Sequence, residues 1–367
     1  MNSGEPVIGF LTYDSAPYRI HQLNKFSTKY KINVYYLTEK KSRAWDLNFE
    51  KKFSETRLKG FIGKRRSLVH LGLLNLVKSN DLIIIGGYDT VSSFIVLFLC
   101  KFLRKKTVLL MDGYLQDKQE NYFKNKLKKL FFKNIDAFFG NGKVTYKLAK
   151  QYDFPDDLYF NQILSVDNKK IYSSLKISGK LKSDLKKKIS GKKVIIYSGR
   201  ILKRKNIELV IEALSLIERK EEFIFLLIGD GPNREGIEKK ALEKDVEIII
   251  TGFIKDQEEL FSLYGLGDLL VLPSSEEVWG LVVNEGMAAG LPIIVSDKCG
   301  CSLDLVIESE NGHIITGNDS LEVSKKIVDC INNKEKYSMK SLEIISNWTY
   351  DKSLDSFNKM IEKVYSV

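Results

Sequence analysis

The chain has 367 residues, of which 44% are hydrophobic and 11% aromatic, a composition typical of globular proteins. This length exceeds the size at which one hydrophobic core stops growing, so two domains are expected. No segment contains the roughly 18 consecutive apolar residues that a membrane-spanning helix requires. The first residues also lack the basic and apolar regions of a signal peptide. We therefore expect a cytoplasmic protein.

The formal net charge of +11 is distributed unevenly along the chain. Residues 1–190 carry 36 Lys and Arg against 17 Asp and Glu, a net charge of +19. Residues 191–367 carry 22 against 30, a net charge of −8. This asymmetry predicts that only the first half of the protein meets an anionic partner.

Short apolar runs alternate with helical patterns, which indicates βα units and parallel sheets covered on both faces. Strands are predicted at residues 7–13, 32–38, 82–86, 107–111, 135–140 and 158–164 in the first half, and at 194–198, 223–228, 247–251, 269–272, 293–295 and 313–316 in the second. The lysine-rich segment 180–193 marks the expected boundary. The pattern predicts an α/β protein with one Rossmann-like domain over residues 1–185 and another over 186–347.

Two carboxylates, Glu277 and Glu285, are separated by seven residues near the start of a short apolar helix. Because this spacing is not a helical repeat, the pair does not lie on one face of one helix. Glu277 belongs to the loop after a predicted strand, and Glu285 to the first turns of the next helix. Backbone N–H groups near Gly280, Leu281 and Val282 would face an anion. The arrangement predicts a polar ligand lying across a helix N-terminus.

Three further segments follow predicted strands in the same half, and they contain Gly199-Arg200 with Lys205, Gly231-Pro232, and Gly252-Phe253. In order with Glu277, Glu285 and the run 288–292 (Ala-Ala-Gly-Leu-Pro), they resemble the donor site of the retaining glycosyltransferases of family 4. The resemblance extends over about residues 192–317 and is weaker before them. It implies the GT-B fold, with two Rossmann-like domains facing across a cleft. It also implies that a C-terminal helix, residues 348–367, returns to the first domain.

The resemblance implies a donor linked to UDP or GDP, with no separate cofactor. By this resemblance, Glu285 accepts hydrogen bonds from the ribose hydroxyls and Glu277 lies near the donor sugar. No Asp-x-Asp sequence is present to hold a metal, so Arg200, Lys205 and the helix N-terminus would stabilise the departing diphosphate. The alternative for the cations is a solvated basic turn, and for each carboxylate a favourable place at a helix N-terminus. The expected donor-binding residues besides Glu285 are Gly199, Gly231, Phe253, Gly280, Leu281 and Val282.

The first half resembles the family less closely. Its first loop lacks the Gly-Gly pair of many relatives, although Pro17-Tyr18-Arg19 resembles those that build polysaccharides. Arg19 would meet a phosphate of donor or acceptor, or else lie at the surface of a helix. Asp112 follows the fourth predicted strand, where relatives place a catalytic His or Asp. Asn141 follows the fifth strand and is expected to contact the acceptor.

The segment 123–133 interleaves lysines with Leu and Phe, as an interfacial helix requires, and Lys64-Arg65-Arg66 adds to the basic half. We expect attachment to the anionic inner face of the cell membrane. A solvated helix covering the sheet is the alternative. The expected function is transfer of a hexose-type unit onto a lipid-linked glycan in surface polysaccharide biosynthesis.

Other functions stay open at this point. A nucleotide-sugar epimerase of the same architecture would need cleft histidines and further acid–base carboxylates. A nucleic-acid-binding protein would fit the basic half, but that half contains no known recognition motif, so nucleic acid is not an expected partner. A non-catalytic partner subunit is a further alternative. The pair Cys299 and Cys301 has no matching second pair, which argues against zinc, and we interpret it as part of a tight turn.

Overall fold

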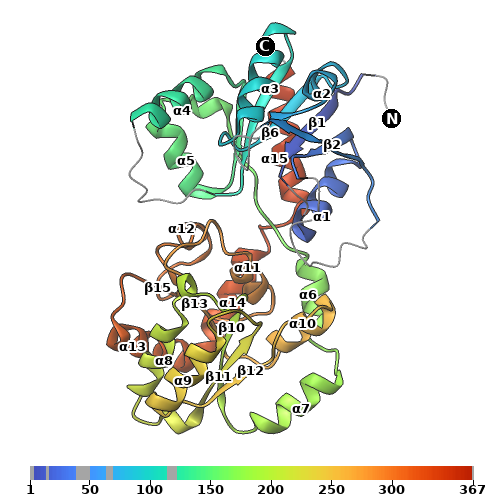
Figure 1. Ribbon diagram of the computed structural model, residues 1–367. Coiled ribbons are helices and arrows are strands. Elements are labelled where there is room, and N and C mark those ends of the chain that lie inside the picture. The colour runs from blue at the N-terminus through green and yellow to red at the C-terminus, as the bar shows by residue number, and fades with distance from the viewer. Residues whose placement is uncertain (1–3, 14–15, 39–49, 63–68, 114–121, 366–367) are drawn as a thin grey trace. The chain divides into compact units, whose positions relative to one another are not determined.

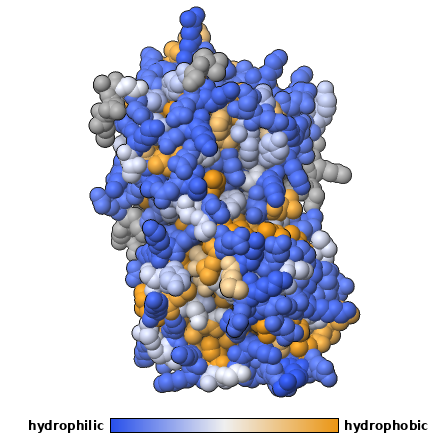
Figure 2. All heavy atoms as spheres, turned by 180° about the vertical axis from the view of Figure 1, so that it is seen from behind, coloured by the Kyte–Doolittle hydropathy of each residue, from blue (hydrophilic) through white to orange (hydrophobic). Residues whose placement is uncertain are grey.

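The computed structural model describes residues 4–13, 16–38, 50–62, 69–113 and 122–365 (Figure 1). The predicted basic triplet Lys64-Arg65-Arg66 lies outside these ranges. The chain forms two compact units: unit 1 comprises Met1–Ser165 with Tyr350–Val367, and unit 2 comprises Val166–Thr349. The surface shown in Figure 2 is mostly hydrophilic, with smaller apolar areas between the charged residues. Among the described helices, none has the length and apolar character needed to cross a membrane.

Unit 1 contains a seven-stranded, fully parallel sheet in the order β3-β2-β1-β6-β7-β8-β9. In that order the strands are Ser54–Arg57, Lys31–Tyr36, Val7–Thr12, Leu82–Gly86, Lys106–Met111, Ala137–Gly140 and Tyr159–Asn161. All six strands predicted for this half are present, the last one shortened. Strand β3 was not predicted because its four polar residues form an exposed edge, which gives no hydrophobic signal. A short antiparallel pair, β4 (Gly60–Ile62) and β5 (Val69–His70), lies outside the sheet.

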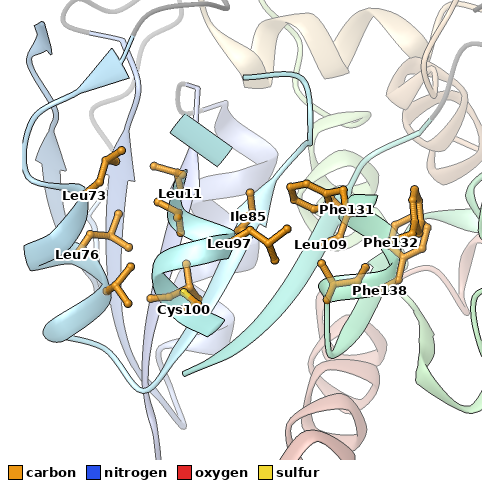
Figure 3. Packing of buried hydrophobic residues seen from close by; sticks show 14 of the residues in the cluster. Leu11, Leu73, Leu76, Ile85, Leu97, Cys100, Leu109, Phe131, Phe132 and Phe138 are labelled. Atoms are coloured by element: carbon orange, nitrogen blue, oxygen red, sulfur yellow. The ribbon is translucent and has the colours of Figure 1, made fainter. Parts of the chain in front are cut away.

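Helices cover both faces of this sheet. One face packs against α2 (Leu73–Lys78), α3 (Val91–Phe102), α4 (Tyr122–Asn134) and α5 (Gly142–Gln151), through the apolar cluster shown in part in Figure 3. The other face packs against α1 (Pro17–Phe26) and the last helix, α15 (Tyr350–Tyr365). The C-terminal helix therefore returns to unit 1, as predicted.

Unit 2 contains a six-stranded parallel sheet in the order β12-β11-β10-β13-β14-β15. In that order the strands are Ile248–Ile250, Phe223–Ile228, Lys193–Ser198, Leu269–Leu272, Ile293–Ser296 and Gly312–Ile315. Numbered within the unit, this is the 3-2-1-4-5-6 order of a Rossmann sheet. Its point of reversal lies between β10 and β13, where ligands of such sheets bind.

The helices of unit 2 form two groups, and the helices within each group pack together. One group is α8 (Ile207–Ser215), α9 (Arg234–Lys244) and α13 (Ser320–Asn332). The other is α6 (Asn168–Ser174), α7 (Lys180–Lys188), α10 (Gln257–Tyr264), α11 (Leu281–Ala288) and α14 (Lys334–Ile345). A short helix, α12 (Ser302–Leu305), follows β14.

The division between the units falls at Ser165/Val166, not at the expected 185/186. The reason is that α6 and α7 pack against α10 of unit 2, and α6 also packs against α11. Asn168 donates hydrogen bonds to the carbonyls of Ile345 and Trp348. The lysines that suggested a linker instead form the last turn of α7.

Helix α15 is anchored in unit 1 by Phe357. Its ring stacks on Phe26, with centroids 4.1 Å apart, and also contacts Phe10, Tyr30 and Phe139. The buried face of the helix is Ser353, Phe357, Met360, Ile361 and Val364. Tyr365, at the end of the helix, is 43% exposed.

We predict that Phe357→Ala lowers the free energy of unfolding of unit 1 by about 3–5 kcal/mol, since it leaves a cavity among four rings. Urea denaturation followed by circular dichroism measures this change. Lys359→Ala, at an exposed position of the same helix, serves as the control and is expected to change stability by less than about 0.5 kcal/mol. A small effect of Phe357→Ala would contradict the assignment of α15 to the core of unit 1.

Candidate functional site

The residues predicted for the donor site gather at the carboxyl edge of the unit 2 sheet. The loops after β10 and β13 start at the point where the strand order reverses. Gly199, which follows β10, has a φ of +141°, and Gly280, which precedes α11, has a φ of +103°. Residues that carry a side chain rarely adopt such φ angles, so both turns depend on glycine.

The loop after β11 crosses directly over the loop after β10. Gly199 N–H donates to the carbonyl of Ile228 over 2.9 Å, and Ile201 N–H donates to that of Asp230 over 2.9 Å. A Cβ atom at Gly231 would lie 2.2 Å from the carbonyl oxygen of Ile201. Close backbone packing thus explains Gly231 without a ligand.

Lys205 and Glu277, which lie 72 residues apart, form an ion pair between the two loops. Lys205 belongs to the short 3₁₀ helix Lys203–Lys205. Arg204 strengthens the link, because its carbonyl accepts a hydrogen bond from Ser275 N–H and its guanidinium donates to the carbonyl of Glu276. The side chains of Lys205 and Glu277 are only 12% and 18% exposed. The site therefore holds a partly desolvated cation and anion together before any ligand arrives.

Arg200 differs from Lys205 because its side chain is exposed. Its carbonyl accepts a hydrogen bond from the buried Tyr197 hydroxyl over 2.9 Å, which fixes the backbone of this turn. No ion pair of Arg200 occurs among the described residues, so its guanidinium is free to meet an anion. Phe253, the predicted residue after β12, is 64% exposed.

Glu285 lies on α11 and accepts a hydrogen bond from the hydroxyl of Tyr264 at 2.6 Å. Burial raises the pKa of Glu285 to about 7, and the Tyr264 hydrogen bond opposes this rise. Gly280 is the N-cap of the helix, and the first intrahelical bond runs from Val283 N–H to its carbonyl. The N–H groups of Leu281 and Val282 consequently point out of the helix start, where an anion binds well.

The turn containing Cys299 and Cys301 supports the Glu277 loop. Gly300 N–H donates to the carbonyl of Glu277, and Cys301 N–H donates to that of Trp279. A Cβ atom at Gly300 would lie 2.1 Å from the carbonyl oxygen of Val278. Both thiols are free and buried, which agrees with the tight-turn interpretation. Among the described residues, no group of His, Cys, Asp or Glu could hold a metal ion.

In unit 1 the structure joins two residues that were predicted for separate roles. Arg19 of α1 forms a buried ion pair with Asp112, which follows β7. The carboxylate of Asp112 also accepts hydrogen bonds from Gln162 at 3.0 Å and from Tyr18 at 2.7 Å. Burial would raise the pKa of Asp112, but Arg19 and these two donors hold it below its ordinary value. With both oxygens bonded, Asp112 is held as an ion between α1 and the loops after β7 and β9, and its catalytic role stays a prediction.

Asn141 has a similar structural role. Its side chain is fully buried, its amide N–H donates to the carbonyl of Asp112, and its oxygen accepts from Leu164 N–H. The amide thus connects the loops after β7 and β9, and contact of Asn141 with an acceptor stays a prediction. Arg19 likewise bonds to Asp112 and Gln22, not to an exposed anion.

Tyr264 was not among the site residues predicted from the sequence. This residue is fully buried at the end of α10, 21 positions before its partner Glu285. Its only signal in the sequence is the general one that a buried Tyr hydroxyl needs a hydrogen-bond partner.

Comparison with known proteins agrees with this geometry. Residues 181–341 match the family model described as glycosyl transferases group 1. Over 121 residues the chain is 36% identical to the sulfoquinovosyl transferase SQD2 of Arabidopsis thaliana, which covers 33% of this chain and 22% of that protein. Over 278 residues it is 27% identical to an uncharacterized glycosyltransferase of Methanocaldococcus jannaschii, which covers 72% of this chain and 70% of that one.

Among solved structures, Anabaena HepE in complex with UDP matches 98% of this chain and 100% of its own, with a TM-score of 0.75 and 16% identity. A glycosyltransferase from Rickettsia africae matches 99% of both chains, with a TM-score of 0.78 and 14% identity. The fold is GT-B. Residues 181–341, which match the glycosyl transferases group 1 model, lie within unit 2 and include Arg200, Lys205, Glu277 and Glu285.

We predict that ionisation of Glu285 lowers the stability of the ligand-free GT-B protein. Its pKa rises on folding from an ordinary value of 4.5 to about 7, so the native state binds more protons between these values. The free energy of unfolding should therefore fall as the pH rises from 4.5 to 7. Glu285→Gln should reduce this decline by on the order of 1 kcal/mol, allowing for partial exposure of the side chain.

Urea denaturation at pH 5 and pH 8 measures the difference. Glu243→Gln, at an exposed position of α9, is the matched control and should follow the wild-type protein at both pH values. An unchanged pH dependence in Glu285→Gln would contradict the raised pKa.

Proposed function

We propose that this protein is a metal-independent, retaining glycosyltransferase of family 4. It moves a hexose-type unit from a UDP- or GDP-sugar onto a lipid-linked glycan in surface polysaccharide biosynthesis. The observation that carries the proposal is the grouping of Lys205, Glu277 and Glu285 near the start of α11, with Arg200 on the loop that leads to Lys205. Structures of HepE, whose fold this chain shares, were determined with UDP and with UDP-glucose, which supports a nucleotide sugar as donor.

Each group has a role set by its chemistry. The Glu285 carboxylate accepts hydrogen bonds from the ribose hydroxyls. Arg200, Lys205 and the N–H groups of Leu281 and Val282 bind the diphosphate and stabilise the negative charge that builds on it. The Lys205–Glu277 pair keeps the ammonium group oriented before the donor binds. Glu277 then lies beside the donor sugar, where its negative charge supports positive charge at the anomeric carbon.

The reaction breaks the bond between the anomeric carbon and the diphosphate oxygen, and forms a bond from that carbon to the acceptor oxygen. Attack on the face from which the diphosphate leaves retains the anomeric configuration. The departing phosphate takes the acceptor's proton, so the reaction needs no protein base. This route is compatible with an Asp112 that is held as an ion by Arg19.

We predict that the purified protein binds one of UDP, GDP and ADP in the presence of a metal chelator, and that Glu285→Ala abolishes this binding. The reason is that the variant removes the acceptor of the ribose hydroxyls from a partly buried position. Isothermal titration calorimetry measures the affinity and also identifies the base.

Two lysines of one turn give the control for the diphosphate contact. Lys205→Ala should weaken nucleotide binding by about tenfold or more, because charge-assisted bonds to phosphate contribute about 1.5–3 kcal/mol. Lys203→Ala, at an exposed position of the same turn, should leave it unchanged. Failure of the folded wild-type protein to bind any of the three nucleotides would overturn the proposed function.

We further propose that unit 1 attaches the enzyme to the anionic inner face of the cell membrane. Three successive helices of unit 1, α2, α3 and α4, contain no Asp or Glu. They pack side by side on one face of the sheet and carry exposed apolar side chains. The most exposed of these are Phe98 (48%), Phe102 (85%), Tyr122 (74%) and Leu127 (51%). We call this surface of α2–α4 the apolar-basic face.

Basic side chains accompany these apolar groups. Lys101, Lys126, Lys129 and Lys133 belong to α3 and α4 and are exposed. Apolar side chains that enter the headgroup region, together with lysines at the lipid phosphates, are typical of interfacial attachment. A position at the membrane would bring the enzyme to a lipid-linked acceptor.

We predict that the double variant Phe98→Ser, Phe102→Ser binds at least tenfold more weakly to vesicles containing phosphatidylglycerol, since it removes two partly inserted rings. Co-sedimentation at low and high salt measures the partition. Leu242→Ser, at a position 83% exposed on α9 of unit 2, is the control and should bind as the wild type does. Equal binding to neutral phosphatidylcholine vesicles would contradict the role of the lysines.

A further inference from the structure

Three elements of unit 2 meet beside the Glu285 carboxylate. Ser198 is the last residue of β10, Tyr264 is the last residue of α10, and Glu285 lies on α11. The Tyr264 hydroxyl donates to Glu285 Oε2 at 2.6 Å, and Ser198 lies close enough to lower the pKa of Tyr264 slightly. Tyr264 is fully buried, and Ser198 is 8% exposed.

The direction of these hydrogen bonds follows from their chemistry. Burial, followed by the charge of Glu285, raises the pKa of Tyr264 well above its ordinary value, so its hydroxyl stays protonated. A carboxylate oxygen only accepts, so the tyrosine donates to Glu285. The second oxygen of Glu285, Oε1, has no partner among the described residues. That oxygen is left for a ligand.

We propose that Tyr264 is a positioning residue: it fixes the orientation and the ionised state in which Glu285 accepts the ribose hydroxyls of the donor. The inference rests on the proposed function, since it concerns the same nucleotide site. It assigns a role to a residue that makes no contact with the ligand and lies outside the Glu-x7-Glu spacing.

The physical need for such a residue lies in two opposing requirements. A ribose diol donates hydrogen bonds, so it needs a charged carboxylate as acceptor. Burial at this position favours the neutral acid, whose proton would compete with the ribose hydroxyls. The Tyr264 hydrogen bond stabilises the charged form and lowers the pKa of Glu285 toward neutrality. Removing the hydroxyl leaves burial unopposed.

No other described group takes the place of Tyr264. Helices α6 and α14 also pack against α11, but burial and Tyr264 are the influences that set the Glu285 pKa. The ionisable residues of these two helices are Lys169, Lys170, Tyr172, Lys334, Glu335, Lys336, Tyr337, Lys340 and Glu343. Lys170, for example, pairs with Glu258 of α10 instead.

The test is the pH profile of nucleotide affinity, measured by calorimetry between pH 5.5 and 9 with whichever of UDP, GDP and ADP the wild type binds. The wild type should bind more weakly as the pH falls below about 7. In Tyr264→Phe the midpoint should move upward by about one unit, which gives an affinity about fivefold lower at pH 7 and largely restored at pH 9.

Two controls separate the possible outcomes. Glu285→Gln retains only the pH dependence of the nucleotide's own phosphates and gives the baseline. Tyr172→Phe, at a position 57% exposed on α6, should reproduce the wild-type profile. Circular dichroism and thermal melting show that each variant is folded.

An equal loss of affinity at every pH in folded Tyr264→Phe would show a purely structural role and overturn the inference. An unchanged profile in that variant would overturn it as well. Both results leave the proposed function intact, because the wild type still binds the nucleotide. Absence of nucleotide binding by the wild type would instead mean that the proposed function itself has failed.

Discussion

The candidate site depends on the link between the loops after β10 and β13, in which Lys205 pairs with Glu277. Each charge is largely removed from water, so each would be costly to leave there without the other. The Arg204 carbonyl accepts a hydrogen bond from Ser275 N–H, and its guanidinium donates to the carbonyl of Glu276, so Arg204 also holds the two loops together. Because β10 and β13 flank the point of reversal in the sheet, the ion pair lies where a Rossmann unit binds its ligand.

For Glu285, in contrast, the fold favours the neutral form, whereas the proposed function needs the charged form. Among the described residues it has a hydroxyl partner but no cation, so burial raises its pKa and favours its neutral form. A ligand that offers two hydroxyl groups relieves this cost. Under the proposed function, part of the donor's binding free energy would come from satisfying a carboxylate that the fold leaves incompletely solvated.

Unit 1 uses its buried charges differently. Arg19, Asp112, Gln22 and Gln162 form one hydrogen-bonded network, and Ser353 of α15 joins it through Gln22 and the carbonyl of Gln162. These groups tie the first helix, the loops after β7 and β9, and the returning helix into one body. On the surface of the unit, the three helices α2–α4 have no acidic residues and together expose aromatic rings and lysines.

The sequence determined the parallel sheets, the strand positions and the donor motif, because runs such as 223–228 are apolar throughout and the glutamates have a fixed spacing near Gly280. It failed for the polar edge strand β3, and it placed the domain boundary in the lysines of α7. Only the tertiary structure decided which partners meet: Tyr264 with Glu285, Lys205 with Glu277, and Arg19 with Asp112, across 21, 72 and 93 residues. Hydrophobic periodicity fixes local backbone and burial, whereas the partner of a buried polar group depends on how distant elements pack.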